Sequence, residues 1–375
     1  MKYRFEEITI NSTEKKKPTP ADKDVYLGLE HLDSDNLAVT RFGSEVAPIG
    51  EKLIIKKGDV LFGKRRAYQK KVAVAPFDGI FSAHGMVLRP KAAVVDSSFF
   101  PLFISSDYFL DAAIKISVGS LSPTINWRDL KELTFDLPPL TEQRKLAGLL
   151  WAANDAREAY KKLLTSTDEL VKSQFVEMFG DPVTNPMGWE LSTLKNVTME
   201  KLSYGSGAAA TKYDNDVRYV RITDIIDNGE LNNDIVSPSE YDEKYLLRDG
   251  DILFARSGAT VGKTFRYSEK WGKCIFAGYL IRLVPNISKV LPDYVFAFTK
   301  TNYYQEFVKI NQRTVAQPNI NAQQYGDLTI CVPPLPLQAR FAGFVRAADK
   351  SKFALQRSID ELEATYKSLL RENLG

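Results

Sequence analysis

Cysteine and histidine are scarce in this sequence. Its 375 residues include two cysteines, Cys274 and Cys331, and two histidines, His31 and His84, all far apart in the chain. So few ligands at such spacings exclude a standard structural zinc site and a CxxC redox motif. We therefore expect no metal on this chain, and the low cysteine content fits a reducing cytosol.

Long apolar runs are also missing. No run approaches the roughly 18 residues that a membrane-spanning helix needs. The N-terminal residues, Met1-Lys2-Tyr3-Arg4-Phe5-Glu6-Glu7, lack the apolar stretch and the small-residue cleavage site of a secretory signal. These absences predict a cytoplasmic protein with no membrane partner.

A strong excess of one charge is absent as well, because the formal net charge is only +3. Taken over the whole chain, this balance is weak support for an acidic partner. One segment is much more basic than the rest and contains a single acidic residue, Asp59. Its basic residues are Lys52, Lys56, Lys57, Lys64, Arg65, Arg66, Lys70 and Lys71. A run of this kind is either a solvated loop face or a surface for an anionic partner.

The composition otherwise describes a folded protein. Hydrophobic residues make up 44% of the chain, which includes 21 Phe and 17 Tyr, and this content argues against wholesale disorder. The chain is too long for one ordinary core and has the length of two domains, each of roughly 100 to 200 residues.

An internal repeat accounts for that length. The segment Gly58-Asp59-Val60-Leu61-Phe62 returns as Gly250-Asp251-Ile252-Leu253-Phe254. Further pairs of segments match in the same order, among them Ile80-Phe81-Ser82-Ala83 with Ile275-Phe276-Ala277-Gly278 and Pro123-Thr124-Ile125-Asn126 with Pro318-Asn319-Ile320-Asn321. These two pairs share one offset, 275 minus 80, or 195 residues. Collinear matches of this kind indicate a tandem duplication.

Each repeat ends in a long segment with helical periodicity. It follows Leu137-Pro138-Pro139-Leu140 in the first repeat and Val332-Pro333-Pro334-Leu335 in the second, and proline pairs favour a position outside a helix. Apolar residues at alternating spacings of three and four predict that the two helices pair as an antiparallel coiled coil, although packing of each helix on its own domain is the alternative. The predicted seam residues are Leu146, Leu149, Ala153, Tyr160, Leu163, Leu170, Phe341, Phe344, Ala348, Leu355, Leu362 and Leu369.

The remainder of each repeat alternates short strand-like runs with turns, such as Lys52-Leu53-Ile54-Ile55 before Val60-Leu61-Phe62. A helix is predicted at residues 99–116 and again at 292–310. The fold class is therefore α+β, with a curved sheet in each of two recognition domains. We predict a first domain at 1–137, a central spacer helix at 138–181, a second domain at 182–332 and a C-terminal spacer helix at 333–375.

Two glycine-rich segments resemble nucleotide-binding loops only superficially. The stretch from Gly258 to Lys263-Thr264 has three residues between its glycines, whereas a phosphate-binding P-loop needs four. Gly205-Ser206-Gly207 follows no hydrophobic strand and precedes no helical period. No catalytic centre is recognisable, so we expect catalytic residues, if any, on partner proteins.

The polar segment after each Gly-Asp-hydrophobic strand is the predicted binding site. Arginine and lysine hold phosphates or read guanine, and glutamine reads adenine. The strand is the same in both repeats while this segment differs, which is typical of one scaffold aimed at two targets. The candidate DNA-binding residues are Lys64, Arg65, Arg66, Tyr68, Gln69, Lys70, Lys71, Arg256, Ser257, Thr260 and Lys263.

Over essentially its whole length, the chain resembles the specificity (S) subunit of type I restriction-modification systems. The resemblance rests on the paired Gly-Asp strands, on the two Pro-Pro segments with Gln143 and Gln338, and on Met187-Gly188-Trp189-Glu190 at the start of the second domain.

The resemblance implies a non-catalytic protein whose two target recognition domains each read one half of a split, double-stranded DNA sequence. It also implies two helices that hold the domains apart and dock two modification (methyltransferase) subunits, with ATP-dependent restriction subunits completing the assembly. No cofactor is then expected on this chain, whereas S-adenosylmethionine, ATP and Mg are expected on the partner subunits.

Two other function classes remain open from the residues alone. One is a coiled-coil scaffold that binds protein or RNA, and the other is an enzyme with its own nuclease centre. DNA binding would weaken steeply with salt, because phosphate contacts release counterions, whereas a hydrophobic protein contact would not. A nuclease would cleave DNA with magnesium in the absence of partners.

Overall fold

A computed structural model describes residues 1–34, 36–313 and 319–374 of the chain. Pro318, which belongs to a matched segment of the repeat, and Gly375, the last residue of the predicted C-terminal helix, lie outside these ranges. The chain divides into two compact units, Met1–Lys161 with Arg357–Gly375 and Lys162–Gln356. The two long helices are therefore not separate domains, since each unit contains part of both. Within the described ranges, no helix is both long and apolar enough to cross a membrane.

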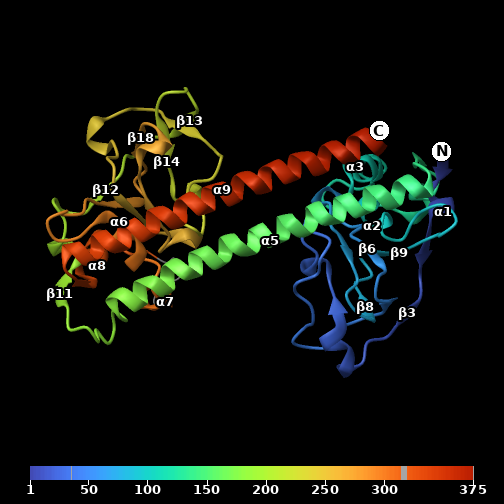
Figure 1. The fold of residues 1–375 in the computed structure, drawn as a ribbon, viewed down its shortest axis with the longest axis horizontal. Coiled ribbons are helices and arrows are strands. Elements are labelled where there is room, and N and C mark those ends of the chain that lie inside the picture. The colour runs from blue at the N-terminus through green and yellow to red at the C-terminus, as the bar shows by residue number, and fades with distance from the viewer. Residues whose placement is uncertain (35, 314–318, 375) are drawn as a thin grey trace. The chain divides into compact units, whose positions relative to one another are not determined.

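The described residues of the first unit form three small sheets, of which strands β3, β6, β8 and β9 are labelled in Figure 1. A two-stranded sheet pairs β1 (Lys2–Arg4) with β10 (Thr134–Asp136) and joins the two ends of the globular part. An antiparallel sheet has the order β2-β9-β6-β7, and a mixed sheet has the order β3-β5-β8-β4. The strands of these two sheets are β2 (Thr9–Ser12), β3 (Lys15–Lys16), β4 (Tyr26–Leu27), β5 (Lys52–Ile55), β6 (Val60–Phe62), β7 (Val72–Val74), β8 (Gly79–Phe81) and β9 (Met86–Pro90).

The second unit repeats this topology. Its four-stranded sheet has the order β12-β19-β16-β17, and β11 pairs with β20 as β1 pairs with β10. β14 pairs in parallel with β18, as β4 does with β8, while β13 and β15 form a separate two-stranded antiparallel sheet. The strands are β11 (Glu190–Thr193), β12 (Ser203–Tyr204), β13 (Ala210–Lys212), β14 (Arg218–Val220), β15 (Val236–Pro238), β16 (Ile252–Ala255), β17 (Thr264–Arg266), β18 (Cys274–Phe276), β19 (Leu280–Leu283) and β20 (Thr329–Val332).

Short helical turns complete both units. In the first unit they are α1 (Phe5–Ile8), α4 (Trp127–Leu130), η1 (Pro20–Val25), η2 (Leu29–His31) and η3 (Ala67–Gln69). In the second unit they are α8 (Ala322–Asp327), η4 (Leu194–Asn196), η5 (Ile222–Asp224), η6 (Glu243–Tyr245), η7 (Gly258–Thr260) and η8 (Glu269–Trp271).

The repeated Gly-Asp pair forms the turn that leads into β6 and β16. Gly58 and Gly250 have φ angles of 90° and 88°, a left-handed conformation that favours glycine. The following carboxylate closes the turn, because Asp59 accepts from the Lys56 amide at 2.8 Å and Asp251 accepts from the Arg248 amide at 3.0 Å. The motif found in the sequence is thus a structural requirement of the turn.

The repeated glutamine joins each long helix to its own domain. The side-chain carbonyl of Gln143 accepts from the Asp96 amide, and its amide group donates to the carbonyls of Val94 and Pro138. Gln338 makes the same three bonds, from the Leu291 amide and to the carbonyls of Lys289 and Pro333. Both side chains are buried, so each one satisfies backbone groups that would otherwise lack a partner.

The helix predicted at 99–116 is broken in the structure. It consists of α2 (Phe100–Ser105) and α3 (Asp107–Lys115), because Ser106 has an extended backbone and its hydroxyl accepts from the Phe109 amide as an N-cap. The helix predicted at 292–310 is likewise divided into α6 (Pro292–Phe298) and α7 (Asn302–Arg313). The single-helix predictions were therefore wrong at the same place in both repeats.

The two long helices are α5 (Leu140–Phe179) and α9 (Leu335–Leu374). In the first unit, the start of α5 packs against the end of α9, since Leu146 and Leu150 share a core cluster with Leu374. In the second unit, the end of α5 packs against the start of α9, since Phe175 and Phe179 share a cluster with Phe341. In each unit the two helix segments are therefore antiparallel, as predicted (Figure 1).

The seam on α5 lies one residue away from the predicted one. Leu149, Leu163 and Leu170 were expected to pair but are 59%, 50% and 54% exposed. Among the predicted residues, Leu146 is buried, and Ala153 and Tyr160 are half-buried. The residues that face inward instead include Leu150, Asn154, Arg157, Leu164, Asp168, Val171 and Phe175. Because the observed seam contains polar residues such as Asn154 and Asp168, a search for apolar periodicity found the exposed leucines one position away instead.

The sequence predicted the buried face of α9 more accurately than that of α5. Phe341 and Ala348 are buried, and the other four predicted residues are half-buried: Phe344, Leu355, Leu362 and Leu369. An ion pair crosses between the helices in the second unit, where Lys352 Nζ lies 3.1 Å from Asp168. Each helix therefore packs on its domain and on the other helix, which combines the two alternatives left open by the sequence.

Candidate nucleic-acid interface

The candidate loop of the first unit follows β6 and is fixed through its backbone. A segment containing Pro123, Thr124 and Ile125 runs along it. The Ile125 amide donates to the Lys64 carbonyl at 2.9 Å, and the Arg66 amide donates to the Pro123 carbonyl at 2.8 Å. Because Ile125 is fully buried, the repeated Ile-Asn motif anchors the loop to the core.

The loop after β16 in the second unit is anchored in the same way. The Ile320 amide donates to the Arg256 carbonyl at 2.8 Å, and Ser257 forms a bridge with Asn319. Ile320 is also fully buried. Each repeat therefore presents a polar loop on an equivalent, rigidly held backbone, which is the arrangement expected of a recognition site.

Three predicted contact residues in the first loop point outward. Arg65, Arg66 and Tyr68 are exposed, and Tyr68 is 56% exposed. Lys64 is half-buried, and burial, with a smaller contribution from Lys15, lowers the pKa of its ammonium group. Gln69 is half-buried, and its carbonyl accepts from the Ser34 hydroxyl at 2.6 Å.

Three predicted lysines are engaged within the protein. Lys70 Nζ lies 2.6 Å from Asp107 and 3.0 Å from Asp111. Lys71 donates to the Leu29 carbonyl at 2.6 Å, and Lys263 Nζ lies 2.7 Å from Asp227. The local sequence around these lysines gave no information about their partners, so all three are less available to DNA than their charge indicated.

The polar residues of the second loop are arranged around a 3-10 turn. Arg256, Ser257 and Thr260 are half-buried, and the Thr260 hydroxyl donates to the Ser257 carbonyl at 3.4 Å. The stretch that resembled a P-loop forms η7 and a turn at Gly262, and it contains the paired Lys263. It thus has no phosphate-binding helix after it.

Three residues that the sequence did not single out as contacts lie at these loops. His84 Nε2 is 3.5 Å from Arg65 Nη1 in the first unit. In the second unit, Tyr204 stacks under Arg256 and Asn319 accepts from it. The available signal was the position of Asn319 immediately before the repeated Ile-Asn motif, since His84 and Tyr204 are distant in sequence from the loops that they contact.

The electrostatics of the first loop centre on His84. Its imidazole is exposed, yet partial burial, followed by the nearby Arg65, Lys64 and Lys52, lowers its pKa from the ordinary value. A histidine among cations stays neutral at physiological pH and gains a proton only in more acidic solution or beside an anion such as phosphate.

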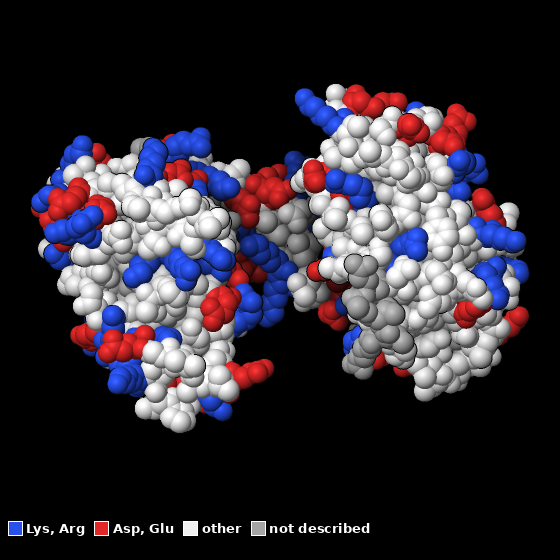
Figure 2. Space-filling view, turned by 180° about the vertical axis from the view of Figure 1, so that it is seen from behind, with Lys and Arg blue, Asp and Glu red and all other residues white. Residues whose placement is uncertain are grey.

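Charge is interleaved rather than continuous on the face drawn in Figure 2, where Lys and Arg alternate with Asp and Glu and with broad uncharged areas in both units. This pattern favours a few placed basic side chains over bulk attraction. Among the described residues, no group of three or more His, Cys, Asp or Glu is arranged to hold a metal ion.

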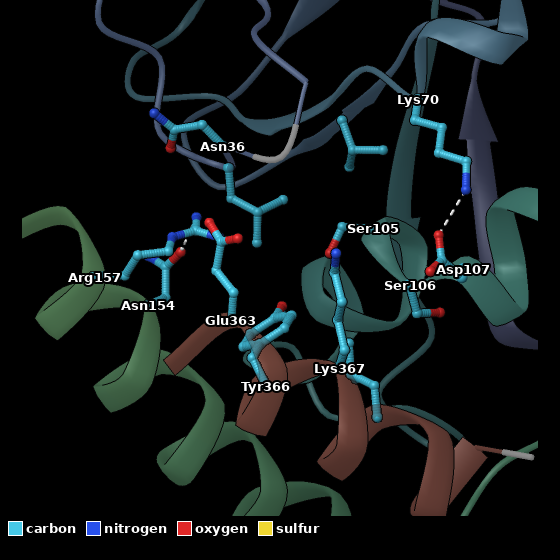
Figure 3. Close-up of a pocket in the computed structure, with 13 residues that line it drawn as sticks. Asn36, Lys70, Ser105, Ser106, Asp107, Asn154, Arg157, Glu363, Tyr366 and Lys367 are labelled. Carbon is cyan, nitrogen blue, oxygen red and sulfur yellow. Dashed lines mark hydrogen bonds and ion pairs between the residues drawn. The ribbon is translucent and has the colours of Figure 1, made fainter. Parts of the chain in front are cut away.

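A cavity of about 100 Å³ lies in the first unit beside α2, α5 and α9 (Figure 3). Lys70, Ser105, Arg157, Glu363 and Lys367 are among its lining residues, so both charges are present. Because the cavity is lined by both positive and negative side chains, its charge favours no single class of ligand. The loops after β6 and β16 therefore remain the better candidate for the nucleic-acid interface.

The second unit has a lysine where the first has Ser105. Lys300 occupies the equivalent position, 195 residues further along the chain. Its ammonium group lies 4.7 Å from the centre of the Phe296 ring and packs against Gly229. Burial lowers the pKa of Lys300 to about 8. The repeats therefore differ at this internal position as well as in their loops.

Comparison with known proteins identifies relatives of this chain. A specificity subunit of the type I restriction enzyme EcoDI from Escherichia coli is 25% identical over 187 residues, which is 48% of this chain and 41% of that protein. A putative MjaX specificity subunit from Methanocaldococcus jannaschii is 24% identical over 369 residues, covering 91% of this chain and 84% of the relative.

Solved structures show the same fold. A crystal structure of a type I restriction-modification S subunit from M. genitalium aligns over 100% of this chain and 96% of its own, with a TM-score of 0.59 and 15% identity. A chain from a structure of type I restriction-modification complex assembly aligns with a TM-score of 0.57 and 20% identity, covering 100% of this chain and 97% of that chain.

The family model for the type I restriction modification DNA specificity domain matches residues 40–158 and 186–364, one match in each repeat. These ranges contain both Gly-Asp turns and both anchored loops. The duplicated fold, the two loops and the family match agree, and the chain belongs to the type I restriction-modification specificity subunits.

Proposed function

We propose that this chain is the non-catalytic subunit that gives a type I restriction-modification enzyme its DNA sequence specificity. Each recognition domain reads one half of a bipartite target in double-stranded DNA. The helices α5 and α9 fix the separation of the half-sites and dock the modification subunits. Family membership and the tandem repeat support this assignment.

One observation carries the proposal. The loops after β6 and β16 are anchored by equivalent backbone hydrogen bonds, to Ile125 and Ile320, but present different side chains. A fixed backbone with variable side chains is suited to reading two different base sequences in the same manner.

The candidate DNA-binding residues fall into two groups, according to how far their charged or polar groups are already engaged within the protein. Arg65, Arg66, Tyr68 and Arg256 make direct contacts with DNA, assisted by Lys64, Gln69, Ser257 and Thr260. Lys70, Lys71 and Lys263 contribute mainly to the local positive potential, because each already has a partner within the protein. Separating a paired lysine from its carboxylate would offset part of the gain from a phosphate contact.

The exposed apolar residues of the helices are the proposed docking surface. Leu149, Leu163 and Leu170 on α5 and Phe353 on α9 are at least half exposed, with Phe353 at 74%. Complete burial of a fully exposed side chain of this size is favourable by about 1.5 to 3 kcal/mol, and each of these residues would gain the share that corresponds to its exposed part. Two modification subunits bind there, and restriction subunits join the assembly. S-adenosylmethionine, ATP and Mg act on these partners and not on this chain.

The decisive experiment is methylation of a random DNA library by this chain co-expressed with the modification subunit of its own system. A split motif with a fixed gap is the expected product, and it gives both half-sites at once. If the chain is folded and the partner is active but no site is methylated, the specificity role is refuted. Magnesium-dependent cleavage by the isolated chain would also contradict the proposal.

A further inference from the structure

Arg256 has an unusually constrained position at the end of β16. Its amide donates to the Tyr279 carbonyl at 3.1 Å, and its carbonyl accepts from the Ile320 amide at 2.8 Å. The backbone is thereby held from two sides, so the side chain starts from a fixed point.

The guanidinium group is also held in one plane. Its central carbon lies 4.8 Å from the centre of the Tyr204 ring, and Nε donates to Asn319 Oδ1 at 3.1 Å. Tyr204 is itself fixed, because its hydroxyl accepts from the Ala322 amide at 3.1 Å. The next residue, Gly205, packs so tightly on the Phe276 and Ala277 carbonyls that no side chain would fit.

The two terminal nitrogens of Arg256 have no hydrogen-bond partner within the described part of the chain. The side chain is half-buried rather than enclosed. Stacking fixes the plane, the Nε bond fixes the rotation within that plane, and the remaining fork of N–H groups is available to a ligand.

The first repeat holds an arginine in a related way. The Arg65 amide donates to the carbonyl of His84, the residue equivalent to Tyr279. Arg65 Nε donates to the Ser122 hydroxyl at 3.3 Å, and Nη1 lies 3.5 Å from His84 Nε2. Both repeats therefore tether an arginine at Nε to the anchoring segment, but only Arg256 has an aromatic ring beneath it and both terminal nitrogens unengaged within the described residues.

A planar fork of two N–H donors matches the O6 and N7 acceptors of guanine in the major groove. Arginine held flat on a ring loses little conformational freedom when it makes this contact. We infer that Arg256 reads one guanine in the half-site of the second recognition domain, with Tyr204 and Asn319 as positioning residues. The inference rests on the proposed function and adds a residue and a base to it.

The test uses the assembled modification enzyme and the same random DNA library. The unmutated enzyme is expected to require guanine at one position of the half-site that belongs to the second domain. Arg256→Ala should reduce the preference for guanine at that position by about 10-fold to 100-fold, while the other half-site stays unchanged. Arg256→Lys should lose most of the same preference, because lysine lacks the planar fork.

The positioning residues give a second measurement. Tyr204→Leu removes the ring and should weaken the guanine preference, whereas Tyr204→Phe keeps the ring and should retain most of it. Asn319→Ala should act in the same direction as Tyr204→Leu. Lys270→Ala is the matched control, since it removes an exposed positive charge from the same unit, paired with Glu230 and outside the Arg256–Lys263 loop. Thermal melts verify that each variant is folded.

The outcomes separate the two proposals. If the unmutated enzyme methylates no split motif, the proposed function itself fails. If it does, but the second half-site contains no guanine or Arg256→Ala leaves every base preference unchanged, the guanine inference is overturned. A uniform loss of affinity at all sequences, with a salt slope reduced by about 1, would identify a phosphate contact and likewise overturn it.

Discussion

The two repeats are alike in backbone and different in side chains at their functional and internal positions. Both have the Gly-Asp turn, the buried glutamine at the start of the long helix and the anchored loop. They differ in the loop residues, in the His84 and Tyr279 pair, and in Ser105 against Lys300. The two repeats therefore share the hydrogen bonds that hold the backbone, including those from Arg65 to His84 and from Arg256 to Tyr279, and they differ in the side chains carried on it.

Exchanging a recognition domain tests the independence of the repeats and has the largest expected effect. Replacing residues 1–137 by the first domain of another family member should change one whole half of the methylated sequence and leave the other half as it was. The readout is library methylation. If both halves changed, the two domains would not read DNA independently.

Adjacent leucines on α5 test the position of the seam. Leu150 is fully buried and Leu149 is 59% exposed. Leu150→Ala should therefore lower the free energy of unfolding by about 2 to 5 kcal/mol, and Leu149→Ala by no more than about 0.5 kcal/mol. Urea denaturation of both variants measures the difference. A larger loss in Leu149→Ala than in Leu150→Ala would support the seam predicted from the sequence over the one in the structure.

The two glutamines test whether the shared frame is equally important in both repeats. Gln143→Ala and Gln338→Ala each remove three hydrogen bonds and leave buried backbone groups without a partner, at a cost of about 2 to 3 kcal/mol. Hydrogen exchange should place the loss in the unit that carries the substitution. A loss confined to one of the two variants would show that the repeats do not depend on this contact equally.

The difference between Ser105 and Lys300 predicts a pH dependence in one repeat. The pKa of Lys300 is lowered to about 8 in the folded protein, against about 10.4 in an unfolded chain. The unfolded chain then binds more protons between these values, so stability rises as pH increases from about 8 to about 10. This rise should disappear in Lys300→Met, as measured by denaturation over that pH range, and Ser105→Ala should leave it in place.

The pair of His84 and Tyr279 predicts a smaller effect on DNA binding. Because the pKa of His84 is lowered, the side chain is neutral at pH 7.5 and becomes positive as pH falls. Affinity of the assembled enzyme for DNA should rise about two- to fivefold more between pH 7.5 and 5.5 than in His84→Gln. Fluorescence anisotropy measures the difference. An identical pH profile for the two proteins would remove His84 from the interface.

The sequence predicted the features that depend on local pattern. The repeat, the strands at Val60–Phe62 and Ile252–Ala255, and the bounds of both long helices agree with the structure. Glycine, proline and apolar spacing carry this information directly. The same rules failed where polar residues such as Asn154 and Asp168 line the seam, and where Ser106 caps a new helix within an apolar run.

The candidate site was only partly predictable, because its residues come from distant segments. Arg65 and Arg256 were identified from their position after a strand, but the histidine, tyrosine and asparagine that contact them lie in other parts of the chain. Charge alone also overestimated the availability of Lys70 and Lys263 to DNA. Their carboxylate partners, Asp107 and Asp227, lie 37 and 36 residues away in the sequence.

The anchoring of each loop by main-chain atoms has a consequence for evolution. The bonds from Ile125 to Lys64 and from Ile320 to Arg256 use amide and carbonyl groups that every non-proline residue possesses. Mutations in the loop can therefore change its chemistry without rebuilding the scaffold that carries it. In the proposed role, point mutations within a loop would change the bases that it reads and leave these anchoring bonds, and with them the fold, intact.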